Sequence, residues 1–232
     1  MKKSFFFLLY LLALPITACY ADRIPLQIED FEILEIRISG KIEWTSGQPG
    51  GSVICSSAQF KEMEIEQNGK KLILDWKNNG KSSWQSGTEK ISFTLSSELL
   101  RRVEITGSAD FNIKGSNKTP EFSLAISGSG DFKGKLDCSG NSNFSVSGSG
   151  DITAEGNCRE MSLRIAGSGN FRGKSFEALK AKVSIAGSGD AEVFASKEMD
   201  AAVSGSGDIR YWGNPEKVSK AVAGSGEVRK GS

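Results

Sequence analysis

Residues 144–152 read Phe-Ser-Val-Ser-Gly-Ser-Gly-Asp-Ile, and the Gly-Ser-Gly-Asp tetrapeptide within them returns along the chain at a nearly constant step. Copies that differ at no more than one position begin at Gly107, Gly128, Gly148, Gly167, Gly187, Gly205 and Gly224, each 18 to 21 residues after the one before. A regular step of about 20 residues is typical of a solenoid, in which each repeat buries its apolar face against its neighbours.

Apolar residues alternate on both sides of the tetrapeptide, which indicates strands rather than helices. Two residues before the first glycine stand Ile105, Ile126, Val146, Ile165, Ile185, Val203 and Val222. Four residues before it stand Val103, Leu124, Phe144, Leu163, Val183 and Ala201. Four residues after it stand Phe111, Phe132, Ile152, Phe171, Ala191, Ile209 and Val228. We therefore expect an all-β parallel β-helix, with the glycines reversing the chain at one repeated corner and these columns pointing inward.

The composition limits the kinds of function open to the chain. The 232 residues carry a formal net charge of +1, and removal of Lys2 and Lys3 with an N-terminal signal leaves 27 basic against 28 acidic residues. This balance gives no reason to expect a nucleic-acid partner. The chain has no histidine, so the commonest general base, zinc ligand and partner of a nucleophilic serine is missing.

The N-terminus has the pattern of an export signal. Lys2 and Lys3 precede a short apolar stretch over residues 5–14, which is too short to span a bilayer. Residues 16–19, Ile-Thr-Ala-Cys, resemble a bacterial lipobox, in which Cys19 would carry the lipid. The alternative is ordinary cleavage after Ala21. We expect an outer-membrane or cell-surface lipoprotein held at the membrane by its lipid alone, or otherwise a periplasmic or secreted protein.

Three segments follow from these patterns: a signal peptide over residues 1–21, an N-terminal β region over 22–102, and the repeat β-helix over 103–232. The tetrapeptide is missing from the second segment, where Asn68-Gly69 within residues 65–70 predicts a hairpin with a type I′ turn. This segment is either a separate domain or a set of atypical coils on the same axis, and we favour the coils because terminal coils are usually irregular.

The fourth position of each tetrapeptide forms a predicted acidic column. Its members are Asp110, Asp131, Asp151, Asn170, Asp190, Asp208 and Glu227. Such a column could bind cations, but the calcium-binding β-roll repeats every nine residues and takes ligands from adjacent turns. We favour a structural role, in which each side chain accepts a hydrogen bond from the backbone of its own turn. No metal or other cofactor is expected.

Cysteines and aromatic residues provide the other candidate sites. Cys138 and Cys158 each follow the first glycine of their repeat by ten residues, so they occupy equivalent places in adjoining coils, as a disulfide or as two buried thiols. The tryptophans and the Tyr211-Trp212 pair could stack on sugar rings, although such residues more often cover a core.

The repeated turns, together with the ending Ser-Gly-Ser-Gly-Asp-Ile-Arg-Tyr-Trp-Gly-Asn-Pro over residues 204–215, resemble the putative auto-transporter adhesin family, also called the head GIN domain. The resemblance runs from about Phe31 to the C-terminus. It implies a right-handed β-helix similar to pectin lyases, without catalytic residues, and a role in adhesion. The sequence departs from the pattern at Ala109, Asn170 and Glu227, which argues against a functional acidic column.

These observations lead to a functional hypothesis. We expect a non-enzymatic β-helix of a Gram-negative cell envelope that acts as an adhesion or binding module through its repetitive flat faces. Its partner would be a glycan or protein on a cell surface, with homo-oligomers left open. The alternatives are a polysaccharide-processing enzyme of pectin-lyase-like fold and a purely structural spacer.

Overall fold

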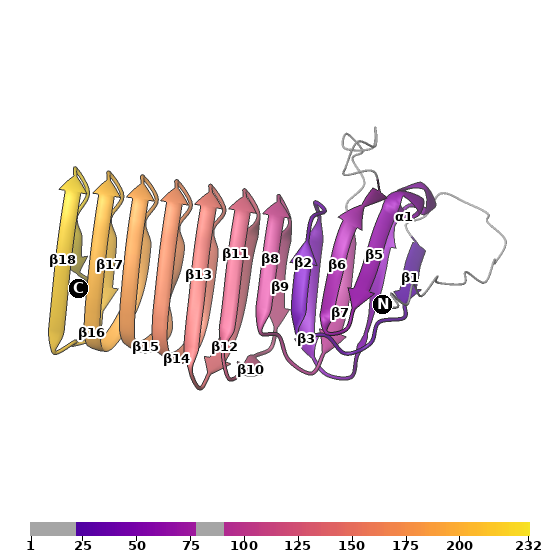
Figure 1. Cartoon of the computed structure of the whole chain (residues 1–232), viewed down its shortest axis with the longest axis horizontal. Helices are drawn as coiled ribbons and strands as arrows, with labels where there is room; N and C mark the ends of the chain where they lie inside the picture. Colours follow the sequence, from indigo (N-terminus) through magenta and orange to yellow (C-terminus); the bar gives the residue numbers. More distant parts are fainter. Residues whose placement is uncertain (1–21, 78–90) are drawn as a thin grey trace, which may run out of the picture.

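The computed structural model describes residues 22–77 and 91–232, which form a β-solenoid of parallel coils with one short helix (Figure 1). The strands and the helix, in chain order, are β1 (Asp22–Leu26), β2 (Ile33–Ile36), β3 (Lys41–Ser46), β4 (Gly50–Cys55), α1 (Ser57–Glu62), β5 (Met63–Asn68), β6 (Lys71–Trp76), β7 (Ser92–Ser97), β8 (Arg102–Gly107), β9 (Asp110–Lys114), β10 (Asn117–Thr119), β11 (Phe122–Gly128), β12 (Asp131–Cys138), β13 (Asn141–Gly148), β14 (Ile152–Gly167), β15 (Phe171–Gly187), β16 (Ala191–Gly205), β17 (Ile209–Trp212), β18 (Lys217–Gly224) and β19 (Val228–Lys230). The predicted all-β parallel β-helix is confirmed.

Each repeat coil consists of a strand, a glycine turn and a second strand. The first glycines of all seven turns pair with one another in parallel register, so the turns form one column along the solenoid. Their φ angles lie between +114° and +137°, a range that favours glycine. The turns also stack closely, since a Cβ added to Gly148 would lie 2.3 Å from the carbonyl oxygen of Gly128. Both the backbone conformation and the close stacking therefore require glycine.

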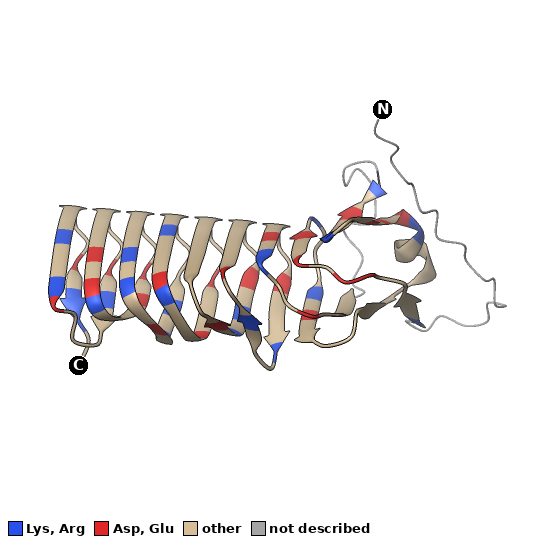
Figure 2. Cartoon of the chain, turned by 60° about the horizontal axis from the view of Figure 1, so that its bottom comes forward, with Lys and Arg blue, Asp and Glu red and all other residues tan. Residues whose placement is uncertain are grey.

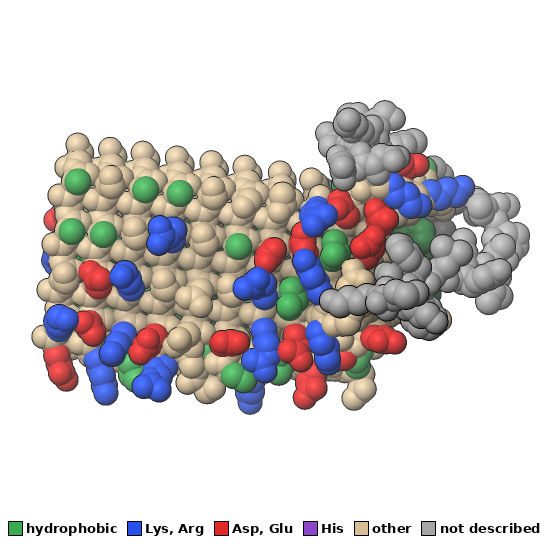
Figure 3. All heavy atoms as spheres, viewed as in Figure 1, with side chains coloured by type: hydrophobic (Ala, Val, Ile, Leu, Met, Phe, Trp, Pro, Cys, Tyr) green, Lys and Arg blue, Asp and Glu red, His purple; other side chains and the backbone are tan. Residues whose placement is uncertain are grey.

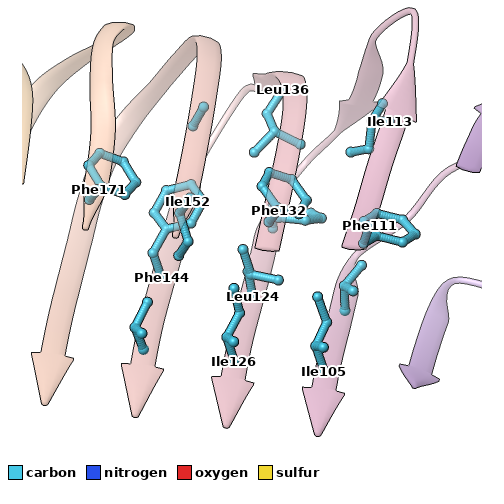
Figure 4. Close-up of a cluster of buried hydrophobic side chains, with 14 of the residues drawn as sticks. Ile105, Phe111, Ile113, Leu124, Ile126, Phe132, Leu136, Phe144, Ile152 and Phe171 are labelled. Atoms are coloured by element: carbon cyan, nitrogen blue, oxygen red, sulfur yellow. The ribbon is translucent and has the colours of Figure 1, made fainter. Parts of the chain in front are cut away.

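The predicted apolar columns fill the space between the two sheets (Figure 4). Ile126, Val146, Ile165 and Ile185 are each no more than 1 % exposed, as the register predicts. The ring of Phe144 lies 5.1 Å from that of Phe171, measured between centroids. Such a close pair of aromatic rings stabilises the stack beyond its apolar burial.

The last member of one column is an exception. Val222 is 45 % exposed, although the residue that pairs with it, Val203, is 3 % exposed. Val222 lies on β18, in the last coil of the solenoid, where the described chain provides no further coil to cover it. Val222 therefore keeps the predicted register of its column but is not buried as the other members are.

The coil formed by β2 and β3 lies in the middle of the order of coils, although it comes early in the chain. β2 pairs in parallel with both β6 and β8, and β3 pairs in parallel with both β7 and β9. Figure 1 shows the same order, with β2 between β8 and β6. The chain thus forms the coil of β2 and β3 first and then the N-terminal cap. It returns along one side of this coil with β6 and β7, and it continues along the other side with β8 and β9.

The coil of β2 and β3 contains a divergent turn that the sequence pattern did not reveal. Ile36 pairs with Ile105 and Lys41 pairs with Asp110, so Ile38-Ser39-Gly40-Lys41 occupies the place of a Gly-Ser-Gly-Asp turn. The backbone N–H of Asp110 donates to the carbonyl oxygen of Gly40 at 2.9 Å. Only Ser39 and Gly40 match the Gly-Ser-Gly-Asp motif, which is too little similarity for the turn to stand out in the sequence.

Antiparallel strands and α1 close the N-terminal end of the solenoid. β1 pairs with β4, β4 pairs with β7, and β5 pairs with β6, all antiparallel. β5 and β6 form the predicted hairpin, with Gly69 at φ +60°. The predicted loop residues are Asn68 and Gly69, whereas the loop of the structure consists of Gly69 and Lys70, one position later. α1 starts at a capping box made by Ser56 and Gln59.

Candidate functional site

The side chains at the fourth turn position form a ladder of hydrogen bonds along the solenoid. The backbone N–H of Asp151 donates to Oδ1 of Asp131 at 2.8 Å, and the N–H of Asn170 donates to Oδ1 of Asp151 at 2.9 Å. The same bond recurs to Asn170, Asp190 and Asp208 from the N–H groups of Asp190, Asp208 and Glu227. Each acceptor therefore joins its coil to the next one.

This geometry corrects the expectation that each side chain bonds within its own turn. The N–H groups inside a turn already have partners in the preceding coil: those of Ser149 and Gly150 both donate to the carbonyl oxygen of Gly128, at 2.9 and 3.2 Å. At the fourth position, the backbone N–H of one coil instead donates to the side-chain oxygen of the fourth-position residue in the preceding coil, as Asp151 N–H does to Asp131. Because Asn170 fills this role as the aspartates do, the position requires an acceptor and not a charge.

Asp151 has additional partners that favour its charged form. Its Oδ2 accepts a hydrogen bond from Arg172 at 2.8 Å, and its Oδ1 also accepts one from the side-chain amide of Asn170 at 2.9 Å. Partial burial by itself would raise the pKa of the Asp151 carboxyl group. The hydrogen bonds from Arg172 and Asn170 outweigh that effect and hold the pKa below its ordinary value.

The acidic column does not assemble into a metal-binding cluster in the part of the chain that the structure describes. Within residues 22–77 and 91–232, no group of three or more His, Cys, Asp or Glu side chains lies close enough together to hold a metal ion. A calcium ion would need several oxygens around one point. The oxygens of this ladder are instead spaced one per coil and used by backbone N–H groups.

The outer side of the sheet formed by β8, β11, β13, β18 and the second halves of β14, β15 and β16 is flat and ordered (Figure 3). We call this surface the flat face, and two columns of mostly small residues run along its half nearest the turns. The first column is Thr106, Ser127, Ser147, Ala166, Ala186, Ser204 and Ala223. The second column is Glu104, Ala125, Ser145, Arg164, Ser184, Ala202 and Ala221.

The other half of the flat face is polar and charged. Its third column is Arg102, Ser123, Asn143, Ser162, Lys182, Asp200 and Ser219. Its fourth column is Asn141, Glu160, Lys180, Glu198 and Lys217. The charges of the fourth column alternate in sign from coil to coil, as the red and blue bands of Figure 2 show. Lys217 lies 2.7 Å from Glu198, and Lys180 lies 3.9 Å from Glu198 and 4.0 Å from Glu160.

A shallow groove of about 290 Å³ lies across the third and fourth columns on β13, β14, β15 and β16. Its polar lining includes Asn141, Asn143 and Ser162 beside the ion pairs. Among the hydrogen bonds of the described chain, none involves the side chain of Asn143 or Ser162, and both residues are exposed. These donors and acceptors are therefore available to a ligand, while the neighbouring charges are already paired. Parallel coils place successive positions of a column about 4.8 Å apart, so the polar groups of Asn143 and Ser162 lie one coil apart on this surface.

Cys138 and Cys158 lie on neighbouring coils, as predicted, and both thiols are buried and not joined to each other in the structure. The residues just before them, Asp137 and Asn157, are paired in register. Burial raises the pKa of the Cys138 thiol and raises that of Cys158 to about 12. Both are therefore neutral, unreactive thiols when reduced. A disulfide between them stays a prediction. Cys19, the predicted lipid attachment site, lies outside the described residues.

The aromatic residues contribute mainly to packing. Trp44 is fully buried, and its Nε1 donates to Oγ of Ser97 at 2.9 Å. Tyr211 is 8 % exposed, and Nζ of Lys174 lies 4.7 Å from the centroid of the Trp212 ring. Trp76 packs against the core, and Trp84 lies outside the described residues. The described tryptophans and Tyr211 thus offer no open row of rings for sugar stacking.

The family of the chain follows from its match over residues 30–215 to the family described as putative auto-transporter adhesin, head GIN domain. The protein belongs to this family. A search of the curated proteins found no match. In the part of the chain that the structure describes, no helix is long and apolar enough to cross a membrane.

Solved structures with the same architecture come from species of Bacteroides and Parabacteroides. A putative adhesin from Bacteroides fragilis is 22 % identical, with a TM-score of 0.83 over 90 % of this chain and 96 % of that chain. A putative lipid binding protein from Parabacteroides distasonis is 25 % identical, with a TM-score of 0.71 over 91 % and 96 % of the two chains. A putative adhesin from Parabacteroides merdae is 18 % identical, with a TM-score of 0.65 over the same shares. At these sequence identities, the two adhesin structures support only the fold of this GIN-domain chain.

Proposed function

We propose that this protein is a non-enzymatic binding module of the cell envelope, and that it holds an extended polar ligand on its flat face. The observation that carries this proposal is the groove over β13, β14, β15 and β16, where the side chains of Asn143 and Ser162 are exposed and make no hydrogen bonds of their own. Membership of an adhesin family supports the same function.

The geometry favours binding over catalysis. A catalytic site is usually a concave pocket that excludes water and contains groups with shifted pKa values. The groove is shallow, and its charged groups alternate in sign and neutralise one another across coils. A flat surface instead allows an extended polymer to contact side chains of several successive coils, which increases the overall affinity through many weak contacts. We infer that the ligand is a glycan or an extended protein segment on a cell surface.

The test is a binding measurement with purified protein on a glycan array and on whole cells, with two variants of strand β14. Ser162→Trp places a large side chain in the groove, and we expect about a 10-fold loss of binding. Thr153→Trp is the matched control, because it lies on the same strand but on the outer side of the other sheet. Equal binding by the wild type and both variants would refute the flat face as the ligand surface.

We also infer that the protein is exported and tethered through lipid on Cys19. Residues 16–19 support this inference, and two or three acyl chains would hold a folded domain stably at a bilayer. Mass spectrometry of the mature N-terminal peptide from native cells is the test. An acylated Cys19 is expected, whereas an unmodified N-terminus at Asp22 would show ordinary signal cleavage.

A further inference from the structure

The middle of the flat face is uncharged. In the third column, Arg102 and Lys182 are separated by Ser123, Asn143 and Ser162, one on each of three successive coils. Figure 3 shows this part of the face in tan, between charged groups on either side. We call the following residues the uncharged window: Ser123 and Ser127 on β11, Asn141, Asn143, Ser145 and Ser147 on β13, and Ser162 on β14.

The hydrogen-bonding groups of the uncharged window are free to bind a ligand. Within residues 22–77 and 91–232, its side chains make no hydrogen bond and no ion pair. Each serine hydroxyl can donate and accept, and each asparagine amide can donate twice and accept twice. Asn141, Asn143 and Ser162 also line the groove of about 290 Å³. The window therefore offers neutral donors and acceptors on three coils, which span about 10 Å from the first to the third.

The charges around the window leave little to hold an anionic ligand. β11 and β13 contain no charged residue. Arg102 lies 3.4 Å from Glu104, and Lys182 lies 4.0 Å from Asp200, so both bordering cations face a carboxylate. Arg164 on β14 is exposed and makes no ion pair within the described residues. Because strong binding of an anion needs free cations, Arg164 is the residue through which a charged ligand would reveal itself.

The window also lacks the features that hold a protein segment. A peptide adds to a sheet at an open edge, but β11, β13 and β14 are each paired on both sides along the window. Anchoring side chains need apolar pockets, whereas the apolar groups at the surface among the window residues are the methyl groups of Ala125 and Ala166. A ligand that is rich in hydroxyl groups and carries no charge fits this surface better.

We propose that the ligand of the flat face is an uncharged glycan that lies across β11, β13 and β14. This inference rests on the proposed function and narrows its ligand to one class. Sugar hydroxyls donate and accept as serine hydroxyls do, so they can pair with Ser123, Asn143 and Ser162 on successive coils. Since these hydrogen bonds join neutral groups, binding does not depend on ionic strength. Binding becomes tighter as the glycan lengthens enough to reach all three coils.

The test measures binding of the purified protein to uncharged glucans, mannans and galactans of increasing length, to sulfated and uronic-acid glycans, and to extended peptides. We expect binding to uncharged glycans, unchanged between low and high salt. Asn143→Ala combined with Ser162→Ala should weaken it about 10-fold. The matched control combines Asn112→Ala with Thr153→Ala, which removes the same kinds of group from the outer side of the other sheet. Arg164→Gln should leave binding unchanged.

The outcomes separate this inference from the proposed function. If charged glycans or peptides bind in place of uncharged glycans and Ser162→Trp blocks them, the flat face is the binding surface but the ligand class is wrong. Weaker binding in Arg164→Gln or in high salt, or no binding of any uncharged glycan, also overturns the inference. If Ser162→Trp binds its glycan as tightly as the wild type does, the ligand lies elsewhere, and the proposed function fails as well.

Discussion

At the scale of single residues, the fourth turn position shows how a side chain can replace a backbone acceptor. After the glycine turn, Phe132 N–H donates to the carbonyl oxygen of Asp151, while Asp151 N–H donates to the side chain of Asp131. One hydrogen bond between these coils therefore has a backbone carbonyl oxygen as its acceptor, and the other has a carboxylate oxygen. An amide oxygen serves equally well, as Asn170 shows.

This leads to a prediction for Asp190, which accepts a hydrogen bond from the N–H of Asp208 at 2.8 Å and makes no ion pair within the described residues. Asp190→Asn keeps the acceptor, so we expect a change in stability of less than about 0.5 kcal/mol. Asp190→Ala removes the acceptor and should cost about 0.5–1.5 kcal/mol. Thermal melting of both variants is the measurement. A drop in the wild-type melting temperature on adding a chelator, absent in Asp190→Asn, would instead indicate a metal site.

A second prediction concerns pH and Asp151. Because the pKa of this carboxyl group is lower in the folded than in the unfolded protein, its ionisation contributes stability above the ordinary value of 3.8. That contribution is lost as the pH falls through the lowered pKa. The melting temperature of the wild type should therefore exceed that of Asp151→Asn at neutral pH, and the gap should close in acid below pH 3.8. Arg172→Gln removes the other partner of the ion pair, so the difference in melting temperature between the wild type and this variant should also close in acid. A difference in melting temperature that does not change with pH would contradict the prediction.

At the scale of elements, successive coils approach closely at the glycine turns. A Cβ added to Gly189 would lie 2.0 Å from the carbonyl oxygen of Gly169, and one added to Gly169 would lie 2.2 Å from that of Gly150. The obstacle is backbone in each case, so it cannot move aside as a flexible side chain would. Glycine at the third position is therefore required by the backbone of the preceding coil, whereas glycine at the first position is required also by its positive φ.

We predict that Gly189→Ala destabilises the protein by at least about 3 kcal/mol, because the added methyl group must push two coils apart. Gly47→Ala is the control, since no heavy atom lies within 4 Å of the Cβ that it would add. Its effect should stay within about 0.5 kcal/mol. Denaturant unfolding followed by circular dichroism compares the two variants, and equal midpoints would show that the coils can separate at this turn without loss.

At the scale of the whole molecule, β2 and β3 connect the N-terminal cap to the repeat coils. Each of these strands has one neighbour on the cap side and one on the repeat side. Two further contacts join the same parts: Nε of Arg101 lies 2.8 Å from Glu32, and Nζ of Lys70 donates to Oδ2 of Asp30 at 2.5 Å. In a solenoid, stability passes from one coil to the next through such interfaces.

We therefore predict that damage to the central coil spreads in both directions. Leu34 on β2 is fully buried, and Leu34→Ala should cost about 2–5 kcal/mol. Hydrogen exchange should show lost protection in β6 as well as in β8. Val222→Ala, at the open end, should cost less than about 1 kcal/mol and affect only the last coils. Loss of protection confined to one side of β2 in Leu34→Ala would show that the coils do not act as linked neighbours.

The sequence by itself determined the repeat coils. The period of about 20 residues, the alternation of apolar residues and the Gly-Ser-Gly turns are each local patterns, and repetition places equal residues in register without knowledge of distant contacts. Only the tertiary structure decided that β2 lies between β6 and β8, because Ile38-Ser39-Gly40-Lys41 carries too little of the motif and parallel pairing of distant strands leaves no local mark. Only the structure decided that Asp131 accepts a hydrogen bond from the next coil rather than from its own turn. The stacking of the coils determines which backbone N–H groups already have carbonyl partners and which one, that of Asp151, is left for the side chain of Asp131. The same holds for Val222, which continues its apolar column in the sequence but is 45 % exposed on β18.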